Sequence, residues 1–174
     1  TDMVKLQIIG APISNYVRVV RIAAHEKGIA YDLLPARPHT PEVDAIHPFG
    51  RIPVMRHGDV VLCEARAIAE YIDGVFPGPS LRPADVLARA KVEQWISLIN
   101  TGYDPVLVRQ YFLAYRFPGT PDGKPDRGRI DKAVPEVDRR LKELDRAVAG
   151  GFLVGQSFTL ADAFLMPILH YLKN

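Results

Sequence analysis

The sequence lacks the features of secreted, membrane-spanning and metal-binding proteins. Cys63 is the only cysteine of 174 residues, so no disulfide can form within the chain, which fits a reducing compartment. No apolar run reaches the roughly 20 residues of a membrane-spanning helix, and the N-terminus lacks a secretory signal pattern. Zinc-ligand spacing, a phosphate-binding glycine loop and a G-x-S-x-G elbow are missing. We therefore expect a cytoplasmic protein without a bound metal.

An excess of charge of one sign is also missing. The formal net charge of +2 gives no electrostatic reason to bind nucleic acid or an anionic membrane, and we expect neither as a partner. Hydrophobic residues make up 48% of the chain, which is enough to bury one large core or two small ones.

The first half of the chain predicts a small mixed sheet with helices on its faces. Short apolar runs bounded by turn residues indicate its strands, and apolar residues at helical spacing indicate its helices. In chain order, the segments are a strand at 5–10, a helix at 15–27, a strand at 30–34, a loop or short irregular helix at 35–46, a hairpin at 54–63 with its turn at 57–59, and a helix from near Glu64. The last helix carries the apolar stripe Ala65, Ile68, Ala69 and Ile72.

The second half predicts helices only. The segments are a long helix at 84–117 that Pro105 should kink or split, a loop at 118–129, a helix with the stripe Val137, Leu141, Leu144 and Val148, and a last helix that Thr159 and Asp162 begin with a capping box. The predicted domains are therefore 1–76 and 84–174, joined by a linker at 77–83.

Pro53 stands at the start of a predicted strand, where proline cannot donate a ladder hydrogen bond. A cis Ile52–Pro53 bond would turn the main chain of Ile52 outward, so that it pairs with an extended peptide as an added strand would. The helix that follows near Glu64 offers free N–H groups and a positive dipole end, which suit a carboxylate. The stretch therefore predicts a site for a small acidic peptide; the alternative is that Pro53 only ends a strand.

Two distant stretches resemble one known family. "HPFGRIP" (47–53) with "EARAI" (64–68) is similar to the N-P-F-G-x-(V/I)-P and E-S-x-A-I signature of the cytosolic glutathione S-transferases. "GFLVGQSFTLADAFLMPILHYL" (151–172) resembles the helical core of that family with its capping box. The likeness runs in order from residue 5 to residue 172. It implies an α/β thioredoxin-like N-terminal domain (βαβ-ββα) plus an all-α C-terminal helical domain.

The resemblance also implies a function. Family members join the thiolate of glutathione, their co-substrate, to small apolar electrophiles, and they form homodimers. Two alternatives stay open: a non-catalytic binding or regulatory protein with this fold, and a related glutathione-dependent isomerase, dehalogenase or peroxidase.

The resemblance assigns the catalytic role to Ser14, which precedes the first helix. In the serine-using phi-like and theta-like members, such as bacterial ones, this serine donates to the sulfur. From spacing alone, Ser14 is better explained as a helix cap than as a catalytic residue. Asn15 and Tyr16 are neighbouring donors that can substitute for it. Cys63, expected on the inner strand of the hairpin, is interpreted as a small core residue.

The remaining site residues also come from the resemblance. The main chain of Ile52 is expected to pair with the cysteinyl unit, and Glu64 with its successor to hold the γ-glutamyl end. The expected glutathione-binding residues are Ile52, Pro53, Glu64, Ala65, Arg66, His39 and Arg51, of which His39 is the candidate for the glycyl carboxylate. The electrophile pocket is expected between the two halves, lined by Tyr103, Tyr111 and Tyr115.

The sequence departs from the family in three places. Ala65 stands where the family has serine, which removes a hydroxyl bond to the ligand worth about 1.5–3 kcal/mol if charge-assisted. His47 replaces the usual asparagine, and the segment 35–46 is shorter than in most relatives. The family also carries further helices beyond the position of residue 174. The helical half is therefore either incomplete at its C-terminal end or shorter than in the family.

Overall fold

The computed structural model describes residues 4–173, which divide into two compact units, one up to Arg82 and one from Pro83 onward. No helix within this described range is long and apolar enough to cross a membrane.

The first unit is built on a mixed sheet of four strands in the order β2-β1-β3-β4. Its strands are β1 (Leu6–Ile9), β2 (Tyr31–Leu34), β3 (Val54–His57) and β4 (Val60–Cys63). β1 is parallel to β2 and antiparallel to β3, and β3 is antiparallel to β4. The predicted strands and hairpin are thus confirmed, but His57 belongs to β3 and the turn is shorter than predicted.

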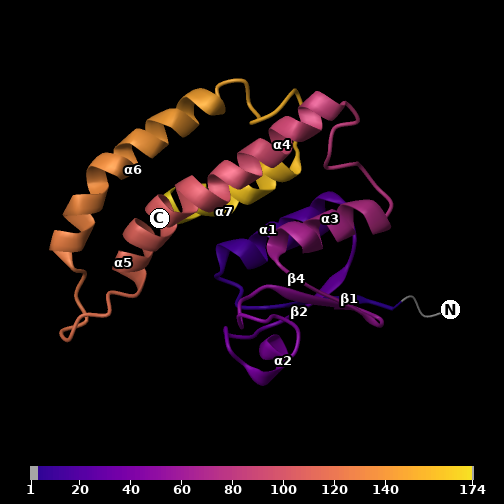
Figure 1. Ribbon diagram of the computed structural model, residues 1–174, viewed down its shortest axis with the longest axis horizontal. Coiled ribbons are helices and arrows are strands. Elements are labelled where there is room, and N and C mark those ends of the chain that lie inside the picture. The colour runs from indigo at the N-terminus through magenta and orange to yellow at the C-terminus, as the bar shows by residue number, and fades with distance from the viewer. Residues whose placement is uncertain (1–3, 174) are drawn as a thin grey trace. The chain divides into compact units, whose positions relative to one another are not determined.

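Helices cover both faces of this sheet. The helices are α1 (Asn15–Glu26), α2 (Pro41–Asp44) and α3 (Ala65–Val75). α1 and α3 lie side by side on one face, and α2 lies on the opposite side of the sheet (Figure 1). The predicted α3 stripe is confirmed, since Ala65, Ile68, Ala69 and Ile72 are all buried. Their spacing of three and four residues places them on the side of the helix that meets the sheet and α1.

The prediction for the strand that carries Cys63 is wrong. β4 is the edge strand and not the inner strand of the hairpin, because β3 lies between it and β1. Cys63 is nevertheless half-buried and packs against the apolar cluster of Ile9, Val43 and Val54. Its interpretation as a small apolar residue therefore agrees with its surroundings.

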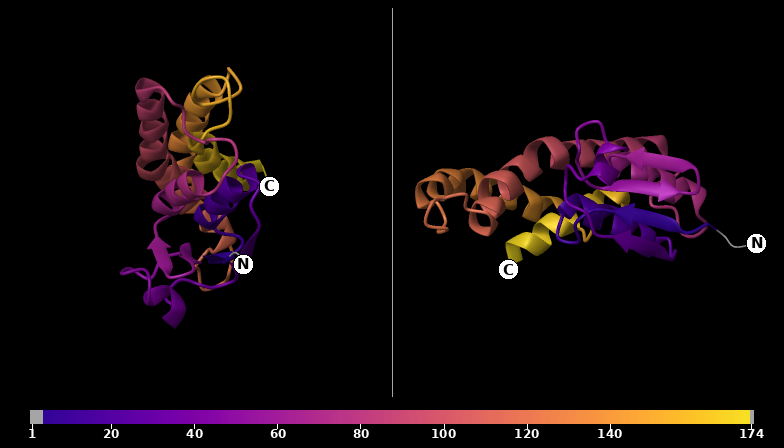
Figure 2. Two further views of the ribbon diagram at one scale, coloured as in Figure 1. Left: turned by 90° about the vertical axis from the view of Figure 1, so that its right-hand side faces the viewer. Right: turned by 90° about the horizontal axis from the view of Figure 1, so that it is seen from below.

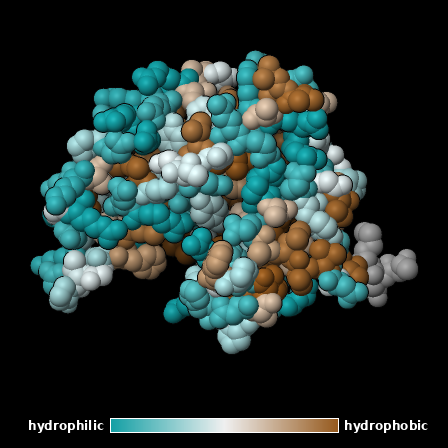
Figure 3. Space-filling model, in the orientation of Figure 1, coloured by the Kyte–Doolittle hydropathy of each residue, from teal (hydrophilic) through white to brown (hydrophobic). Residues whose placement is uncertain are grey.

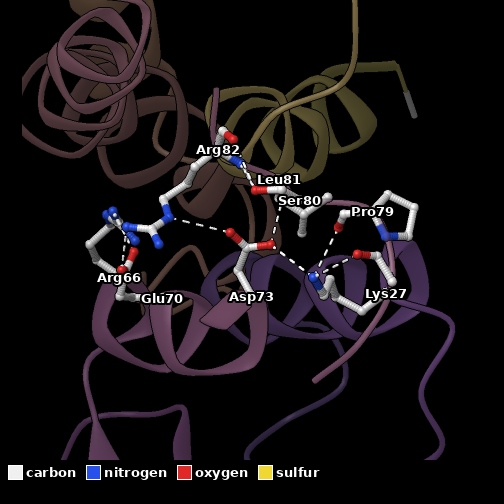
Figure 4. Close-up of polar contacts among 9 residues, drawn as sticks. Lys27, Arg66, Glu70, Asp73, Pro79, Ser80, Leu81 and Arg82 are labelled. Atoms are coloured by element: carbon white, nitrogen blue, oxygen red, sulfur yellow. Dashed lines mark hydrogen bonds and ion pairs between the residues drawn. The ribbon is translucent and has the colours of Figure 1, made fainter. Parts of the chain in front are cut away.

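The segment after α3 is tied to the first unit by a buried ion pair. Lys27 Nζ lies 3.2 Å from Asp73 Oδ1, with side chains only 3% and 1% exposed. Lys27 also donates to the carbonyl oxygen of Pro79 (3.0 Å), and Asp73 accepts from the backbone N–H of Leu81 (2.8 Å) and from Arg82 Nε (3.3 Å) (Figure 4). These bonds give both buried charges several partners, as buried charges require.

The second unit contains helices and turns in the part of it that the structure describes. They are α4 (Val86–Leu98), the π-helix η1 (Ile99–Phe112), α5 (Leu113–Arg116), α6 (Arg127–Ala147) and α7 (Leu160–Lys173). Within this unit, α6 and α7 both pack against η1, and α7 also packs against α4 (Figure 2).

Pro105 disturbs the long helix in a different way from the prediction. The helical winding continues from α4 into α5, but it widens to a π-helix around Pro105. Proline lacks the N–H that would bond a carbonyl oxygen of the preceding turn, and its ring crowds that turn. A wider turn is one way to relieve the crowding and to accommodate the missing bond.

The helix α6 begins earlier than predicted. Asp126 caps it by accepting the N–H of Arg129 at 3.1 Å, so the loop before it ends at residue 126 and not at 129. Val137 and Leu144 of the predicted stripe are buried, whereas Leu141 is 37% exposed at its margin and Val148 follows the helix end. The capping box of α7 is confirmed: Asp162 Oδ2 accepts the N–H of Thr159 at 3.0 Å.

Candidate glutathione site

Strand register brings the predicted site residues of the first unit to one edge of the sheet, formed by the ends of β1, β2 and β4 and the start of β3. Ile9 at the end of β1 pairs with Leu34 at the end of β2 and with Val54 at the start of β3. Val54 in turn pairs with Cys63 at the end of β4. The segments that carry Ser14, His39, Ile52 and Glu64 therefore all leave or enter the sheet at this edge.

Gly10 allows two of these segments to approach closely. A Cβ on Gly10 would lie 2.5 Å from Val17 Cγ2 and 3.3 Å from the Cβ of Ile52. A side chain at this position would therefore collide with Val17 and crowd Ile52. The loop that leads to Ser14 runs beside the Ile52–Pro53 bond for this reason.

Ser14 caps α1 and keeps a hydroxyl hydrogen for another partner. Its extended backbone (φ −61°, ψ 130°) is that of an N-cap, and its Oγ accepts the N–H of Val17 at 3.4 Å. A hydroxyl accepts through its lone pairs and donates its own hydrogen separately. The cap and the donor to sulfur are therefore compatible roles for one side chain. Of the two alternative donors, Asn15 is buried and Tyr16 is half-buried.

The Ile52–Pro53 bond is cis, as expected from the sequence. Pro53 is buried, and Ile52 is half-buried against the cluster of Ile9, Val43 and Val54. The ladder of β3 begins at Val54, so Ile52 lies just before the paired part of the strand. This position is the one at which an extended peptide can add to the sheet through main-chain bonds.

Glu64 ends β4 and begins α3 in an unusual backbone conformation. Its φ of 72° is rare for a residue other than glycine and costs about 1–3 kcal/mol. Its side chain does not cap α3 but turns to His47, whose Nε2 lies 2.9 Å from Glu64 Oε1. Ala65 and Arg66 form the first turn of α3, whose amide groups point out of the helix N-terminus.

His39 and Arg51 lie on the rim of the same edge. The backbone N–H of His39 donates to the carbonyl oxygen of Gly50 at 2.9 Å, so the loop after β2 is attached next to Arg51. The ring of His39 is exposed, with Nδ1 3.7 Å from Asp44 Oδ1. The exposed Arg51 guanidinium lies over the ring of Phe49, 5.7 Å from its centroid. The His39 imidazole and the Arg51 guanidinium therefore have carboxylate or aromatic neighbours but remain accessible to an anion.

The other predicted cation, Arg66, lies on α3. It donates to Glu70 one turn later at 3.2 Å and is half-buried. Among residues 4–173, no group of three or more histidine, cysteine, aspartate or glutamate side chains is placed to hold a metal ion.

Tyr103 of η1 belongs to the second unit and is buried there. Its hydroxyl donates to Glu143 Oε2 at 3.0 Å, and Arg140 lies 5.8 Å from its ring centroid. Burial, followed by the hydrogen bond to Glu143, raises the pKa of Tyr103. Burial acts to raise the pKa of Glu143 as well, but bonds from Arg140 and Tyr103 outweigh it, so that pKa is lowered. At neutral pH the pair is therefore a neutral phenol bound to a carboxylate.

Tyr111 and Tyr115 form an edge-to-face pair with ring centroids 5.3 Å apart. Burial, then the hydrogen bond with Tyr115, raises the pKa of Tyr111. Arg127 donates to the Tyr115 hydroxyl at 3.0 Å, and this contact raises the pKa of Arg127. Half-exposed aromatic rings suit an apolar ligand with few polar groups.

Comparison with known proteins decides the family. Residues 8–80 match the model of the glutathione S-transferase N-terminal domain, and residues 86–174 match that of the C-terminal domain. The chain belongs to the glutathione S-transferase family. Glutathione S-transferase 3 from Zea mays is 34% identical over 181 residues, which cover 96% of this chain and 79% of that protein.

Solved structures of glutathione transferases share the fold. Poplar glutathione transferase F1 superimposes with a TM-score of 0.84 at 27% identity, over 98% of this chain and 82% of that one. A theta class glutathione S-transferase from Xanthomonas axonopodis pv. citri, solved with glutathione bound, gives a TM-score of 0.81 at 28% identity, over 94% and 80% of the two chains.

Two features of this glutathione S-transferase were missed at the level of sequence. His47 was noted only as a departure from the family motif, and nothing in the sequence indicates that it reaches Glu64. The pairing of Lys27 with Asp73 was not predicted, although an aspartate beside the α3 stripe is a weak signal of a buried charge.

Proposed function

We propose that this glutathione S-transferase binds glutathione at the sheet edge where Ile52, Glu64 and Ser14 meet. The supporting observation is the register that gathers the cis Ile52–Pro53 bond, the N-terminus of α3 and the Ser14 loop at one edge. The enzyme joins the glutathione sulfur to a small apolar electrophile.

Each end of glutathione has a matching partner at this edge. The main chain of Ile52 pairs with the cysteinyl unit as an added strand does. The N-terminus of α3 takes the γ-glutamyl carboxylate, and the Glu64 carboxylate takes the ammonium group beside it. His39 and Arg51 on the rim face the glycyl carboxylate. Arg66 adds positive charge near the γ-glutamyl end.

Ser14 supplies the chemistry. A free thiol has a pKa of about 8.5 and is mostly protonated at neutral pH, whereas the thiolate is the nucleophile. A donated hydrogen bond from Ser14 stabilises the anion, and lowering the pKa by about two units takes about 2.7 kcal/mol. The thiolate then forms a carbon–sulfur bond, and in a substitution the halide departs with the electrons of the bond that breaks. Tyr111 and Tyr115 are the candidate contacts for the electrophile, whereas Tyr103 is buried and its hydroxyl is bound to Glu143.

The enzyme also has a surface that suits a homodimer. β4 is an edge strand, and Val60 and Val61 on it are 40% and 48% exposed. Apolar side chains gather over this end of the first unit (Figure 3), and Phe49 is 66% exposed. An edge strand with exposed apolar side chains is a ready site for a second copy of the chain. Sedimentation velocity should give twice the monomer mass, and a single monomer species would contradict this arrangement.

We place the protein in the cytoplasm, because its single cysteine fits a reducing compartment. Cell fractionation tests this placement, and recovery with extracellular or membrane fractions would contradict it.

Binding and turnover by the wild-type protein test the proposed function. We expect retention on immobilised glutathione, a rise in Tm when glutathione is added, and conjugation of 1-chloro-2,4-dinitrobenzene above the uncatalysed rate. Binding without turnover of any chloronitrobenzene acceptor would favour the non-catalytic alternative. That alternative and the related glutathione chemistries have less support, since relatives such as the maize protein are named glutathione S-transferases.

A further inference from the structure

His47 is a buried histidine with fixed hydrogen-bond roles. Its ring is 2% exposed, and its Nδ1 accepts the backbone N–H of Phe49 at 3.0 Å. Because Nδ1 is the acceptor, a neutral ring carries its proton on Nε2, which donates to Glu64 Oε1 at 2.9 Å. The backbone N–H of His47 donates to the carbonyl oxygen of Val43 at 2.8 Å. The ring is thus held at both ends by the protein.

Glu64 is the exposed partner of this contact. Its side chain is 63% exposed, whereas that of His47 is almost completely covered. One carboxylate oxygen binds His47, and Oε2 is left to face a ligand. An exposed glutamate without an anchor samples several rotamers, and binding would have to immobilise it. A rigid donor that fixes one oxygen removes much of that cost before the ligand arrives.

We propose that His47 is a positioning residue that holds the Glu64 carboxylate in place for the γ-glutamyl ammonium group of glutathione. The inference rests on the proposed function, because it assumes that glutathione binds at this edge. It assigns to His47 a part in ligand affinity and none in the chemical step.

The geometry separates this role from that of the usual asparagine. An asparagine Oδ1 can occupy the place of Nδ1 and accept the Phe49 N–H, but its side chain is too short to reach Glu64. A glutamine places its amide nitrogen near the position of Nε2 and can donate to Glu64, but it loses the acceptor for Phe49. Each substitution therefore keeps one of the two bonds of His47: asparagine keeps the bond to Phe49, and glutamine keeps the bond to Glu64.

The experiment compares His47→Gln with His47→Asn. Calorimetry should give a glutathione Kd within about threefold of wild type for His47→Gln and about tenfold weaker for His47→Asn, with kcat at saturating glutathione unchanged in both. The His47→Asn loss should vanish when the ligand is a glutathione analogue that lacks the γ-glutamyl amino group. A purely structural role through Phe49 predicts the reverse order of the two variants and the same loss with both ligands.

A second variant on the exposed partner keeps the inference testable if His47 variants do not fold. Glu64→Asp retains the negative charge but is one methylene too short to keep the bond to His47. We expect it to weaken glutathione binding at least fivefold and to leave binding of the desamino analogue unchanged. Wild-type affinity in Glu64→Asp or in His47→Asn would overturn the role of His47. Failure of the wild-type protein to bind glutathione would instead overturn the proposed function itself.

Discussion

Replacing Ser14 with alanine is expected to lower kcat/KM for glutathione conjugation about 50-fold at pH 6.5. The variant loses the hydroxyl hydrogen that stabilises the thiolate, so the pKa of the bound thiol returns to about 8.5 from about two units lower. The rate follows the thiolate, which is present above the pKa. The loss should therefore approach about 100-fold well below pH 6.5, shrink between pH 6.5 and 8.5, and nearly vanish above pH 8.5.

Two control variants separate catalysis from helix capping at Ser14. Ser14→Gly removes the hydroxyl but costs the helix only a few tenths of a kcal/mol, so it should fold normally and its kcat/KM should still fall about 50-fold at pH 6.5. Asp126→Ala removes the cap of α6, bonded to the Arg129 N–H at 3.1 Å, and should lose about 1 kcal/mol of stability without losing activity. If Ser14→Gly keeps wild-type kcat/KM and its pH profile, Ser14 is only a cap.

Replacing Asp73 with alanine is expected to lower the free energy of unfolding of the first unit by about 3–5 kcal/mol. The change removes the carboxylate partner of Lys27, whose side chain is 3% exposed, and it removes the acceptor for the N–H of Leu81. Figure 4 shows the two side chains pointing toward one another, with residues of the 78–82 segment around them. We expect this segment to separate from α1 and α3 in the variant.

Urea unfolding followed by far-ultraviolet circular dichroism measures this effect. Tryptophan fluorescence would report on the second unit instead, because the only tryptophan, Trp95, lies there. The matched control is Lys142→Met, which breaks a lysine–aspartate pair of 2.7 Å whose side chains are 67% and 60% exposed. That exposed pair should contribute less than about 1 kcal/mol. Lys27→Met with Asp73→Leu should cost less than the sum of the single changes, and strict additivity would show that the two charges do not interact.

The periodic parts of the fold were predictable because local spacing determines them. The stripe of α3 repeats at three and four residues, so it specifies a helix with one buried face. The capping box at Thr159 and Asp162 was predictable because both partners lie within one turn of each other. Long-range features were not predictable in this way. Lys27 and Asp73 are 46 positions apart, and only the folded chain brings them together.

The candidate site also has local features that were predictable and long-range features that were not. A cis bond at Pro53 and a helix N-terminus after Cys63 follow from local residue types, and the structure contains both. The position of β4 at the sheet edge depends on which strand of the hairpin pairs with β1. Short apolar runs do not specify that pairing. The contact of His47 with Glu64 depends on a positive φ at a non-glycine residue, which no residue type signals. The roles of the site residues toward glutathione remain predictions.

A crystal structure of the protein with glutathione tests the central claim most directly. We predict that the main-chain N–H and carbonyl of Ile52 pair with the cysteinyl unit, that the γ-glutamyl end lies between Glu64 and the first turn of α3, and that the sulfur lies within hydrogen-bond distance of Ser14 Oγ. Glutathione bound elsewhere, or at this edge with its sulfur turned away from Ser14, would contradict the account.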